Sequence, residues 1–445
     1  MLSSIGETMT LPTRVRAGYA LGSLVTGSFG TVPGLLLLPY LTDTLGVAAG
    51  VSGLVVLAPK AWDVLVNPVA GRISDRTRGR LGARRPYLIG GGLLVAVLFA
   101  LIFAAPLREF RAAYVAVAFL ATATAFAFFQ VPYVAMPAEM TDDYAERTRL
   151  MTWRVALLAL AILIAGAVSP IVAKSAGGGI PGHRNMGLFV AGLIVLGTIG
   201  VFWGTRSAPT GTVLPSEPTL RAQLAVVGRN RPFRLLLVSF VVQAAGIATV
   251  LAGVKYFATH VVHSPDTGPT LLFVCFVGPA MLVMPLWTRI GARLGKSRAY
   301  ALASALLAGG CLTLVLAFTL PVVAVYLLTA VIGVGYAGQQ VFGLAMLPDC
   351  IAYDAARTGR RQAGVFTGVW TAGETLGLAF GPGIYALVLQ LFGYVSSETG
   401  SAAVQSSTAR VGVLLGSTLV PALIMGLGLI PMRRYDLDEK VLEAA

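Results

Sequence analysis

Residues 186–204 read MGLFVAGLIVLGTIGVFWG, a run without a single charged side chain. Wound as an α-helix, a run of this length crosses the ~30 Å hydrocarbon core of a lipid bilayer. Similar runs recur along the whole chain of 445 residues, which is 56% hydrophobic and 12% charged. Ordinary soluble domains carry about 25% charged residues. Because a helix satisfies its own backbone hydrogen bonds in lipid, the sequence predicts an all-α membrane protein with many transmembrane helices.

The apolar runs between charged or Pro/Gly-rich breaks predict twelve transmembrane helices in two groups of six. The first group is expected near residues 16–41, 51–73, 86–105, 112–136, 150–172 and 186–204. The second group is expected near residues 233–257, 270–290, 299–318, 322–347, 365–392 and 411–430. The chain should therefore consist of an N-terminal half over residues 1–205, a cytoplasmic linker over 206–232 and a C-terminal half over 233–445.

Positively charged side chains gather in alternate loops. The loops after the second, fourth, sixth, eighth and tenth spans hold most of them, and Arg16 and Arg433 stand at the two ends of the apolar region. By the positive-inside rule, these loops and both termini are expected in the cytoplasm. Residues 1–12 are polar, so no cleavable signal peptide is predicted and the chain should lie in a bacterial-type inner (plasma) membrane. The net charge of +14 then needs no nucleic-acid partner.

Two similar halves predict secondary transport by alternating access, in which one half rocks against the other around a central cavity. No Walker, GxSxG or HExxH motif occurs, so no enzyme activity is predicted. The cysteines show no metal or redox spacing: Cys275, Cys311 and Cys350. The histidines fall in loops predicted to face outward and are expected to be solvated: His183, His260 and His263. We therefore expect neither a metal nor a cofactor.

Few charged residues lie inside the predicted spans, where a charge at the bilayer centre costs about 2.5–3.5 kcal/mol even on the most lenient scales. They are Lys60, Asp63, Arg154, Lys255 and Glu374. Lys60 and Asp63 are three residues apart on one helical face, so they can form a structural pair or an ion-coupling site. Arg154 and Lys255 lie near span ends, where each can also extend its charge to the interface.

Four blocks of sequence carry a family resemblance. They read KAWDVLVNPVAG at 60–71 with SDRTR at 74–78, VPY at 131–133 with DYAERTRL at 143–150, MLPD at 346–349, and GVWTAGETLGLA at 368–379. These blocks resemble the glycoside–pentoside–hexuronide:cation symporters, the melibiose-permease-like branch of the major facilitator superfamily. The resemblance runs from the second span to the eleventh and implies the major facilitator superfamily fold with cation-coupled sugar transport.

The resemblance also implies a cation-coupling site at Asp63, with Lys60 and Asn67 beside it. Melibiose-type permeases place a second aspartate where this chain has Asn67. A lone carboxylate offers a sodium ion less charge and fewer oxygen ligands, so a proton is expected as the coupling ion rather than sodium.

The solute is expected to contact side chains that hydrogen-bond to hydroxyls or offer a flat apolar face. These candidates are Gln130, Tyr133, Arg154, Gln340, Trp370, Thr371 and Glu374, with Trp153 and Gln339 chemically similar. Each can alternatively be a helix-packing contact. Where the family has aspartates in spans one and four and a lysine in span eleven, this chain has Gly27, Gln130 and Thr375. A galactoside site of the melibiose-permease type is therefore not expected.

Charged residues at the cytoplasmic ends of the spans are expected to form ion-pair networks that hold the two halves in the outward-facing state. These cytoplasmic gate candidates are Asp75, Arg76, Glu146, Arg147 and Asp349. Single surface pairs contribute about 0–1 kcal/mol, so only a network can bias such an equilibrium. The alternative is a solvated loop that simply follows the positive-inside rule.

These patterns together predict a monomeric symporter that moves a sugar, glycoside or similar small polar solute through the inner membrane. A first alternative keeps the fold and transports a lysolipid, drug or other amphiphile, which the missing carboxylates would suit. A second alternative is a membrane assembly factor or sensor that does not transport. Uptake of labelled sugars against labelled lysolipids separates the first two, and exchange across proteoliposomes tests the third.

Overall fold

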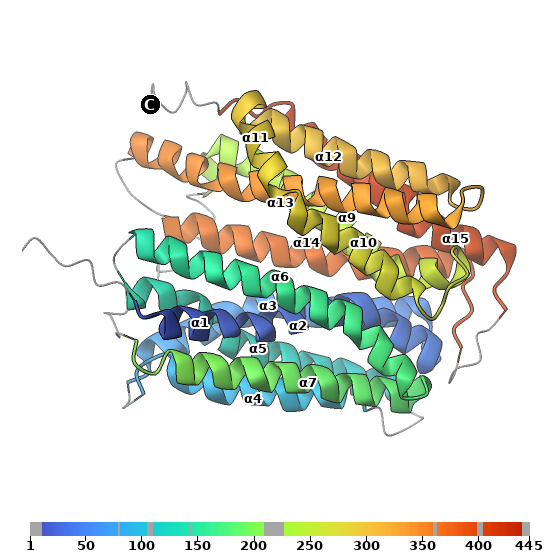
Figure 1. Cartoon of the computed structure of the whole chain (residues 1–445), viewed down its shortest axis with the longest axis horizontal. Coiled ribbons are helices and arrows are strands. Elements are labelled where there is room, and N and C mark those ends of the chain that lie inside the picture. The colour runs from blue at the N-terminus through green and yellow to red at the C-terminus, as the bar shows by residue number, and fades with distance from the viewer. Residues whose placement is uncertain are drawn as a thin grey trace, which may run out of the picture. The chain divides into compact units, whose positions relative to one another are not determined.

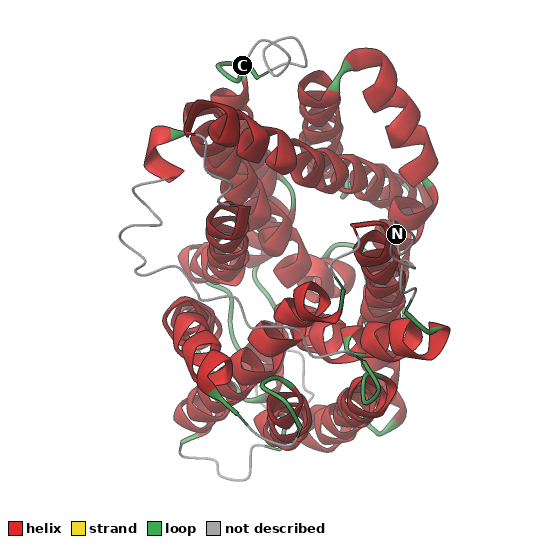
Figure 2. Ribbon diagram, turned by 90° about the vertical axis from the view of Figure 1, so that its left-hand side faces the viewer, coloured by secondary structure: helices red, strands yellow, loops and turns green. Residues whose placement is uncertain are grey.

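The computed structural model describes residues 11–78, 81–104, 110–141, 144–208, 227–358, 363–397 and 404–437, and over these ranges it contains helices and no strand (Figure 2). The helices of the first half are α1 (Thr13–Leu21), α2 (Ser23–Val32), the π-helical turns η1 (Pro33–Leu37) and η2 (Tyr40–Thr44), α3 (Ala49–Arg76), α4 (Arg85–Ile102), α5 (Arg111–Met140), α6 (Tyr144–Ser175) and α7 (Gly179–Gly204). Those of the second half are α9 (Arg231–His260), α10 (Gly268–Leu282), α11 (Met284–Leu294), α12 (Lys296–Thr313), the 3₁₀ turn η3 (Leu314–Leu316), α13 (Val322–Thr358), α14 (Ala363–Leu391), α15 (Ser407–Ser417) and α16 (Leu419–Met432) (Figure 1).

Within the described ranges, eleven helical segments are long and apolar enough to cross a membrane. The pair α10 and α11, bent by 54° at a short break, supplies a twelfth span when it is counted as one. The predicted all-α fold with twelve spans is confirmed in this form. Four spans are built from more than one helical element: α1 with α2 and η1, α10 with α11, α12 with η3, and α15 with α16.

The breaks within these spans have local causes. Gly22 separates α1 from α2, and a Cβ at this position would lie 2.4 Å from the ring of Tyr133. Pro285 stands in the first turn of α11, where its missing N–H needs no partner. The break between α10 and α11 therefore leaves no unpaired backbone N–H at Pro285.

The described helices fall into two compact units. Unit 1 holds α1, α2 and the chain from Trp62 of α3 through α7, whereas unit 2 holds residues Gly34–Ala61 and every helix from α9 onward. The boundary between the units therefore lies inside α3. Pro59 stands two residues before it and has no N–H to donate to the carbonyl of Val55, so α3 lacks a backbone hydrogen bond at this point.

The same helix pairs pack together in each unit. In unit 1, α2 packs on α6 and α7, while α4 packs on α5 and α7. In unit 2, α9 packs on α14 and α16, while α12 packs on α13 and α16. Counted as spans, the first contacts the fifth and sixth and the third contacts the fourth and sixth in both cases. The two units are thus built on one packing plan, as expected for a repeat.

Small residues allow some of these helices to approach closely. At the crossing of α14 and α9, a Cβ on Gly381 would lie 2.3–2.5 Å from atoms of Ala248 and Thr249, two of them backbone atoms. Farther along the same two helices the core of unit 2 is aromatic, with the ring centroids of Phe240 on α9 and Trp370 on α14 lying 4.2 Å apart. The predicted division into residues 1–205, 206–232 and 233–445 stays a prediction, and residues 209–226 of its linker lie outside the described chain.

Candidate functional site

A cluster around Arg154 joins three spans of unit 1. The rings of Tyr19 on α1 and Tyr133 on α5 stack with centroids 4.7 Å apart, and the Tyr133 hydroxyl donates to the Tyr19 carbonyl at 2.9 Å. The Arg154 guanidinium of α6 lies 5.2 Å from the centroid of the Tyr133 ring. Ser23 on α2 donates to the Arg154 carbonyl at 3.0 Å. These contacts hold the Arg154 guanidinium against the face of the Tyr133 ring. Such a cation–π interaction is stronger where water is excluded.

Two buried polar atoms beside this cluster have no hydrogen-bond partner in the described part of the chain. They are Nε of Arg154 and Oε1 of Gln130, which stands one turn before Tyr133 on α5. A buried donor or acceptor left unpaired costs about 1–3 kcal/mol. The hydroxyls of a ligand can satisfy both the Arg154 donor and the Gln130 acceptor. Tyr133 itself is fully buried, so its ring orients Arg154.

The ion-coupling candidates all lie on α3. Asp63 is buried, with 5% of its surface exposed, whereas Lys60 and Asn67 are partly exposed. Trp62 fixes the rotation of the helix in unit 1, because its indole N–H donates to Thr124 of α5 at 3.0 Å. The unit boundary passes between Lys60 and Asp63, although both are on one continuous helix.

The remaining solute candidates lie in unit 2. Glu374 on α14 is within hydrogen-bonding reach of the Gln340 amide on α13, which also donates to the Tyr336 hydroxyl at 3.1 Å. Thr371 is exposed on α14, one turn before Glu374, and bonds to its own helix. Trp370 is 2% exposed and packs in the core of unit 2, and its indole nitrogen has no partner in the described chain. The roles predicted for these residues in solute binding stay predictions.

Gln339 and Trp153, which are chemically similar to the solute candidates, differ in exposure. Gln339 is buried and bonds to Tyr300 in the core of unit 2, whereas Trp153 of α6 is 45% exposed. Gln339 therefore has the setting of a packing residue.

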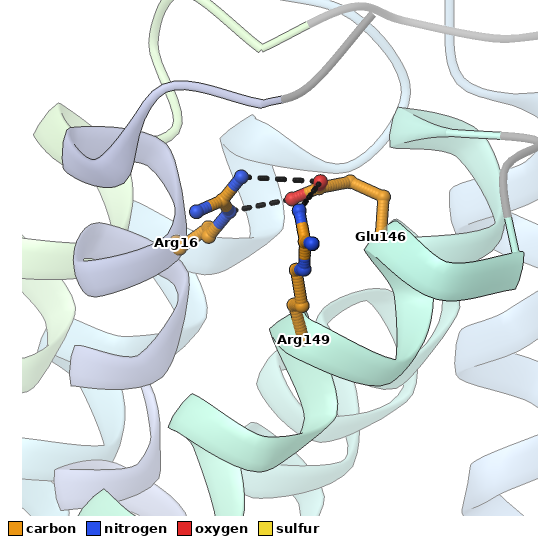
Figure 3. Close-up of polar contacts among 3 residues, drawn as sticks. All are labelled: Arg16, Glu146 and Arg149. Carbon is orange, nitrogen blue, oxygen red and sulfur yellow. Dashed lines mark hydrogen bonds and ion pairs between the residues drawn. The ribbon is translucent and has the colours of Figure 1, made fainter. Parts of the chain in front are cut away.

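The gate candidate Glu146 forms a network within unit 1 (Figure 3). Its carboxylate accepts two hydrogen bonds from Arg16 of α1, one of them at 3.1 Å, and lies 3.5 Å from the guanidinium of Arg149. Glu146 is 1% exposed, so this pair is worth more than a solvated one. The sequence could not identify Arg16 as the partner, since the two residues are 130 positions apart.

Asp349 is paired in the same way within unit 2. The Lys296 ammonium at the start of α12 donates to both carboxylate oxygens, at 2.8 and 2.6 Å. Arg76 is exposed at the end of α3, while the side chains of Asp75 and Arg147 lie outside the described residues. Glu146 and Asp349 thus each have a cation of their own unit as a partner.

A polar cluster that sequence reasoning missed lies at the other end of unit 2; we call it the Asp43 cluster, and it consists of Thr42, Asp43, Tyr256, His260 and Tyr394. The Tyr394 hydroxyl donates to Asp43 at 2.9 Å, and His260 Nε2 lies 3.3 Å from that hydroxyl. Thr42 donates to Asp43 at 2.8 Å and lies 2.6 Å from the Tyr256 hydroxyl. The cluster ties η2 to the end of α9 and to the segment after α14.

The histidine predictions need correction. His183 lies inside α7 and is 6% exposed, with Nδ1 2.7 Å from the Gly179 carbonyl oxygen and its ring stacked on Phe103. It is buried because α7 begins at Gly179, before the uninterrupted apolar run. His260 is the last residue of α9 and is partly buried in the Asp43 cluster, so of the three histidines His263 is the exposed one.

Comparison with known proteins decides the family. Residues 18–439 match the family described as MFS/sugar transport protein. The chain belongs to this family. The family resemblance predicted from the four sequence blocks is confirmed, as is the prediction that this membrane protein is a secondary transporter and not an enzyme.

Its relatives in this family are similar over nearly their whole length. The uncharacterized symporter YnaJ of Bacillus subtilis is 27% identical over 96% of this chain and 92% of its own. The glucuronide carrier protein homolog of Escherichia coli is 25% identical over 96% and 93% of the two chains. The isoprimeverose transporter of Lactiplantibacillus pentosus is 23% identical over 96% and 90%.

Solved structures agree on the fold. A bacterial homologue of the lysosomal transporter Spinster, inward-facing and unoccupied, has a TM-score of 0.69 at 14% identity and covers 95% of this chain and 96% of its own. The nucleoside transporter NupG has a TM-score of 0.64 at 12% identity and covers 95% and 99%. At such identities these likenesses establish the major facilitator superfamily architecture of this transporter and nothing about its solute.

Proposed function

We propose that this protein is a symporter that moves a sugar, glycoside or similar polar solute into the cell together with a proton. Relatives named for a glucuronide and for isoprimeverose match it end to end. The observation that carries the proposal is the pair of unpartnered buried atoms Arg154 Nε and Gln130 Oε1, one on the side chain that lies against the Tyr133 ring and the other one turn before Tyr133 on α5. A polyol supplies hydroxyls that accept from the first and donate to the second. An alkyl chain would leave both unsatisfied, which disfavours the amphiphile alternative.

Asp63 is the proposed coupling group. It is a buried carboxylate on α3, with an amide at Asn67 where a second carboxylate would complete a sodium site. Sodium would therefore find one charged ligand, whereas a proton needs one carboxyl. A carboxylate inside a membrane protein is a functional hypothesis by default, and its burial fits a proton that is carried through a closed state.

We further propose an inner-membrane location with both termini in the cytoplasm. The arginine-rich ends of α1 and α3 then lie inside, and the Asp43 cluster lies at the periplasmic end. Glu146 and Asp349 are each paired within their own unit. A latch between the halves would therefore require these carboxylates to exchange partners during the transport cycle.

Exchange across proteoliposomes tests the function. Purified protein is loaded with a sugar inside the vesicles, and entry of labelled glucuronide, labelled isoprimeverose and labelled lysophosphatidylcholine is followed. One of the two sugars should exchange, and Gln130→Ala should weaken its apparent affinity about three- to tenfold, the effect of one lost hydrogen bond.

The control is Thr313→Val, which removes an exposed hydroxyl bonded only to its own helix at 2.8 Å within the described structure. Its affinity should equal that of the unmodified protein. Exchange of the lysolipid but of neither sugar would establish the amphiphile alternative, and exchange of none of the three solutes would contradict the proposal.

A further inference from the structure

Glu374 is a carboxyl group in the membrane span Val365–Leu391. Its side chain is partly exposed, and Thr371 on the neighbouring turn of α14 is exposed. This face of α14 is therefore not covered by other helices of unit 2. Trp370, in contrast, turns into the core against Phe240 of α9.

The groups around Glu374 are neutral. On α13, the Gln340 amide is within reach of the carboxyl, and the Tyr336 hydroxyl is near enough to feel its charge. On α9, the residues facing the adjacent turn of α14 at Gly373 are Val241 and Leu237. The packing of α15 on α14 lies farther along, where the hydroxyls of Tyr385 and Ser417 are 3.2 Å apart.

No cation compensates this carboxyl among the residues that the structure describes. The position after it is Thr375, where the family resemblance would place a lysine. One amide donor does not balance a full charge in a poorly hydrated site, and the remaining hydration must come from water on the uncovered face. A ligand that covers that face removes this water. The protonated carboxyl, in contrast, keeps the Gln340 contact and becomes a hydrogen-bond donor.

We propose that Glu374 is a solute-binding group that works only in its protonated form, so that solute affinity in the second half depends on pH. The inference rests on the proposed transport of a hydroxyl-bearing solute, whose oxygens accept the hydrogen bond that the carboxylic acid donates. It makes Glu374 a specificity group for hydroxyl-bearing solutes, separate from the proposed coupling carboxyl Asp63 on α3. An ionised Glu374 weakens solute binding, because the bound solute would displace the water around the carboxylate without supplying a positive charge in its place.

The test is sugar exchange between about pH 6 and pH 9 in an Asp63→Asn background, where the pH dependence of the coupling group is gone. The probe is labelled isoprimeverose, or labelled glucuronide if that is the sugar exchanged. Apparent affinity should fall by up to about tenfold per pH unit on the alkaline side, as expected for one proton. Adding Glu374→Gln, which keeps the shape and stays neutral, should abolish this fall and retain the affinity seen at acid pH.

Gln340→Leu gives an independent arm, because it removes the amide that stabilises the ionised carboxyl. The loss of affinity should then begin at a more alkaline pH. Asp266→Asn, a carboxyl change at an exposed position outside the spans, should leave the profile unchanged. A flat profile in Asp63→Asn alone, or a fall that survives Glu374→Gln, overturns the inference. If neither sugar exchanges at any pH, the failure belongs to the proposed function instead.

Discussion

Replacing Tyr394 by phenylalanine removes one hydroxyl from the Asp43 cluster and leaves the ring in place. The hydroxyl donates to the Asp43 carboxylate at 2.9 Å and lies 3.3 Å from His260 Nε2. A hydrogen bond to a charged group contributes about 1.5–3 kcal/mol, and the partial exposure of both residues places this one at the lower end. A loss of about 1.5–2 kcal/mol in the closed Asp43 cluster corresponds to roughly a 10- to 30-fold shift toward a state in which this cluster is open.

The shift can be measured with a cysteine at position 386. Ala386 is 1% exposed and faces Gly53 of α3 within unit 2. In a protein whose three native cysteines are replaced by serine, Ala386→Cys should react with an impermeant maleimide only when this contact opens. Tyr394→Phe should raise the labelling rate about 10- to 30-fold. Tyr326→Phe is the control, because no hydrogen bond of its hydroxyl is seen in the described structure.

The increase in labelling rate caused by Tyr394→Phe should not depend on pH in the ordinary assay range. Burial, and then the negative charge of Asp43, raise the pKa of the Tyr394 hydroxyl above its usual range. The hydroxyl therefore remains a donor, and the ratio of labelling rates should be the same at about pH 6 and pH 8. Equal labelling of Tyr394→Phe and its parent, with unchanged membrane abundance, would refute the assignment of this cluster as a closing contact.

Three further predictions concern coupling, packing and orientation. Asp63→Asn should abolish sugar accumulation driven by a pH gradient while leaving sugar exchange measurable, and steep sodium-dependent uptake by the unmodified protein would contradict this assignment. Gly381→Ala should lower the thermal midpoint and membrane abundance, because a Cβ meets backbone atoms of Ala248 and Thr249 at 2.4–2.5 Å, an overpacking cost of about 1–3 kcal/mol. Gly426→Ala, with no atom within 4 Å of its Cβ, should not. Ser175→Cys should be labelled from the periplasm of intact cells, whereas tags at both termini should be reached only in inverted vesicles; the reverse pattern would invert the proposed orientation.

The spans could be predicted from sequence because the signal is local. An apolar run such as residues 186–204 determines by itself that a helix crosses the membrane. The ends of the spans and the breaks within them are harder to predict from sequence. The sequence predicts a first span to residue 41, but the helix changes at Gly22, and its last turns, η1 and η2, are π-helical and close to prolines.

The site candidates could be named from residue type but their partners could not. The sequence motif predicts a gate role for Glu146, which stays a prediction, yet its partner Arg16 is 130 positions away. His260 is expected to be solvated because it falls in a loop predicted to face outward, whereas Asp43 and Tyr394 pack beside it from segments far apart in the chain. Pairings of this kind depend on tertiary packing, which hydropathy does not encode.

The sharing of α3 between the two units has a mechanical consequence. A helix shared by two compact units bends most easily where its backbone is weakest, and Pro59 removes a backbone hydrogen bond two residues before the boundary between unit 2 and unit 1. The missing bond spans residues 55–59, so Lys60 and Asp63 both follow the weakened turn on one continuous stretch of α3. Bending at Pro59 therefore moves Lys60 and Asp63 together and leaves their three-residue spacing on the helix unchanged.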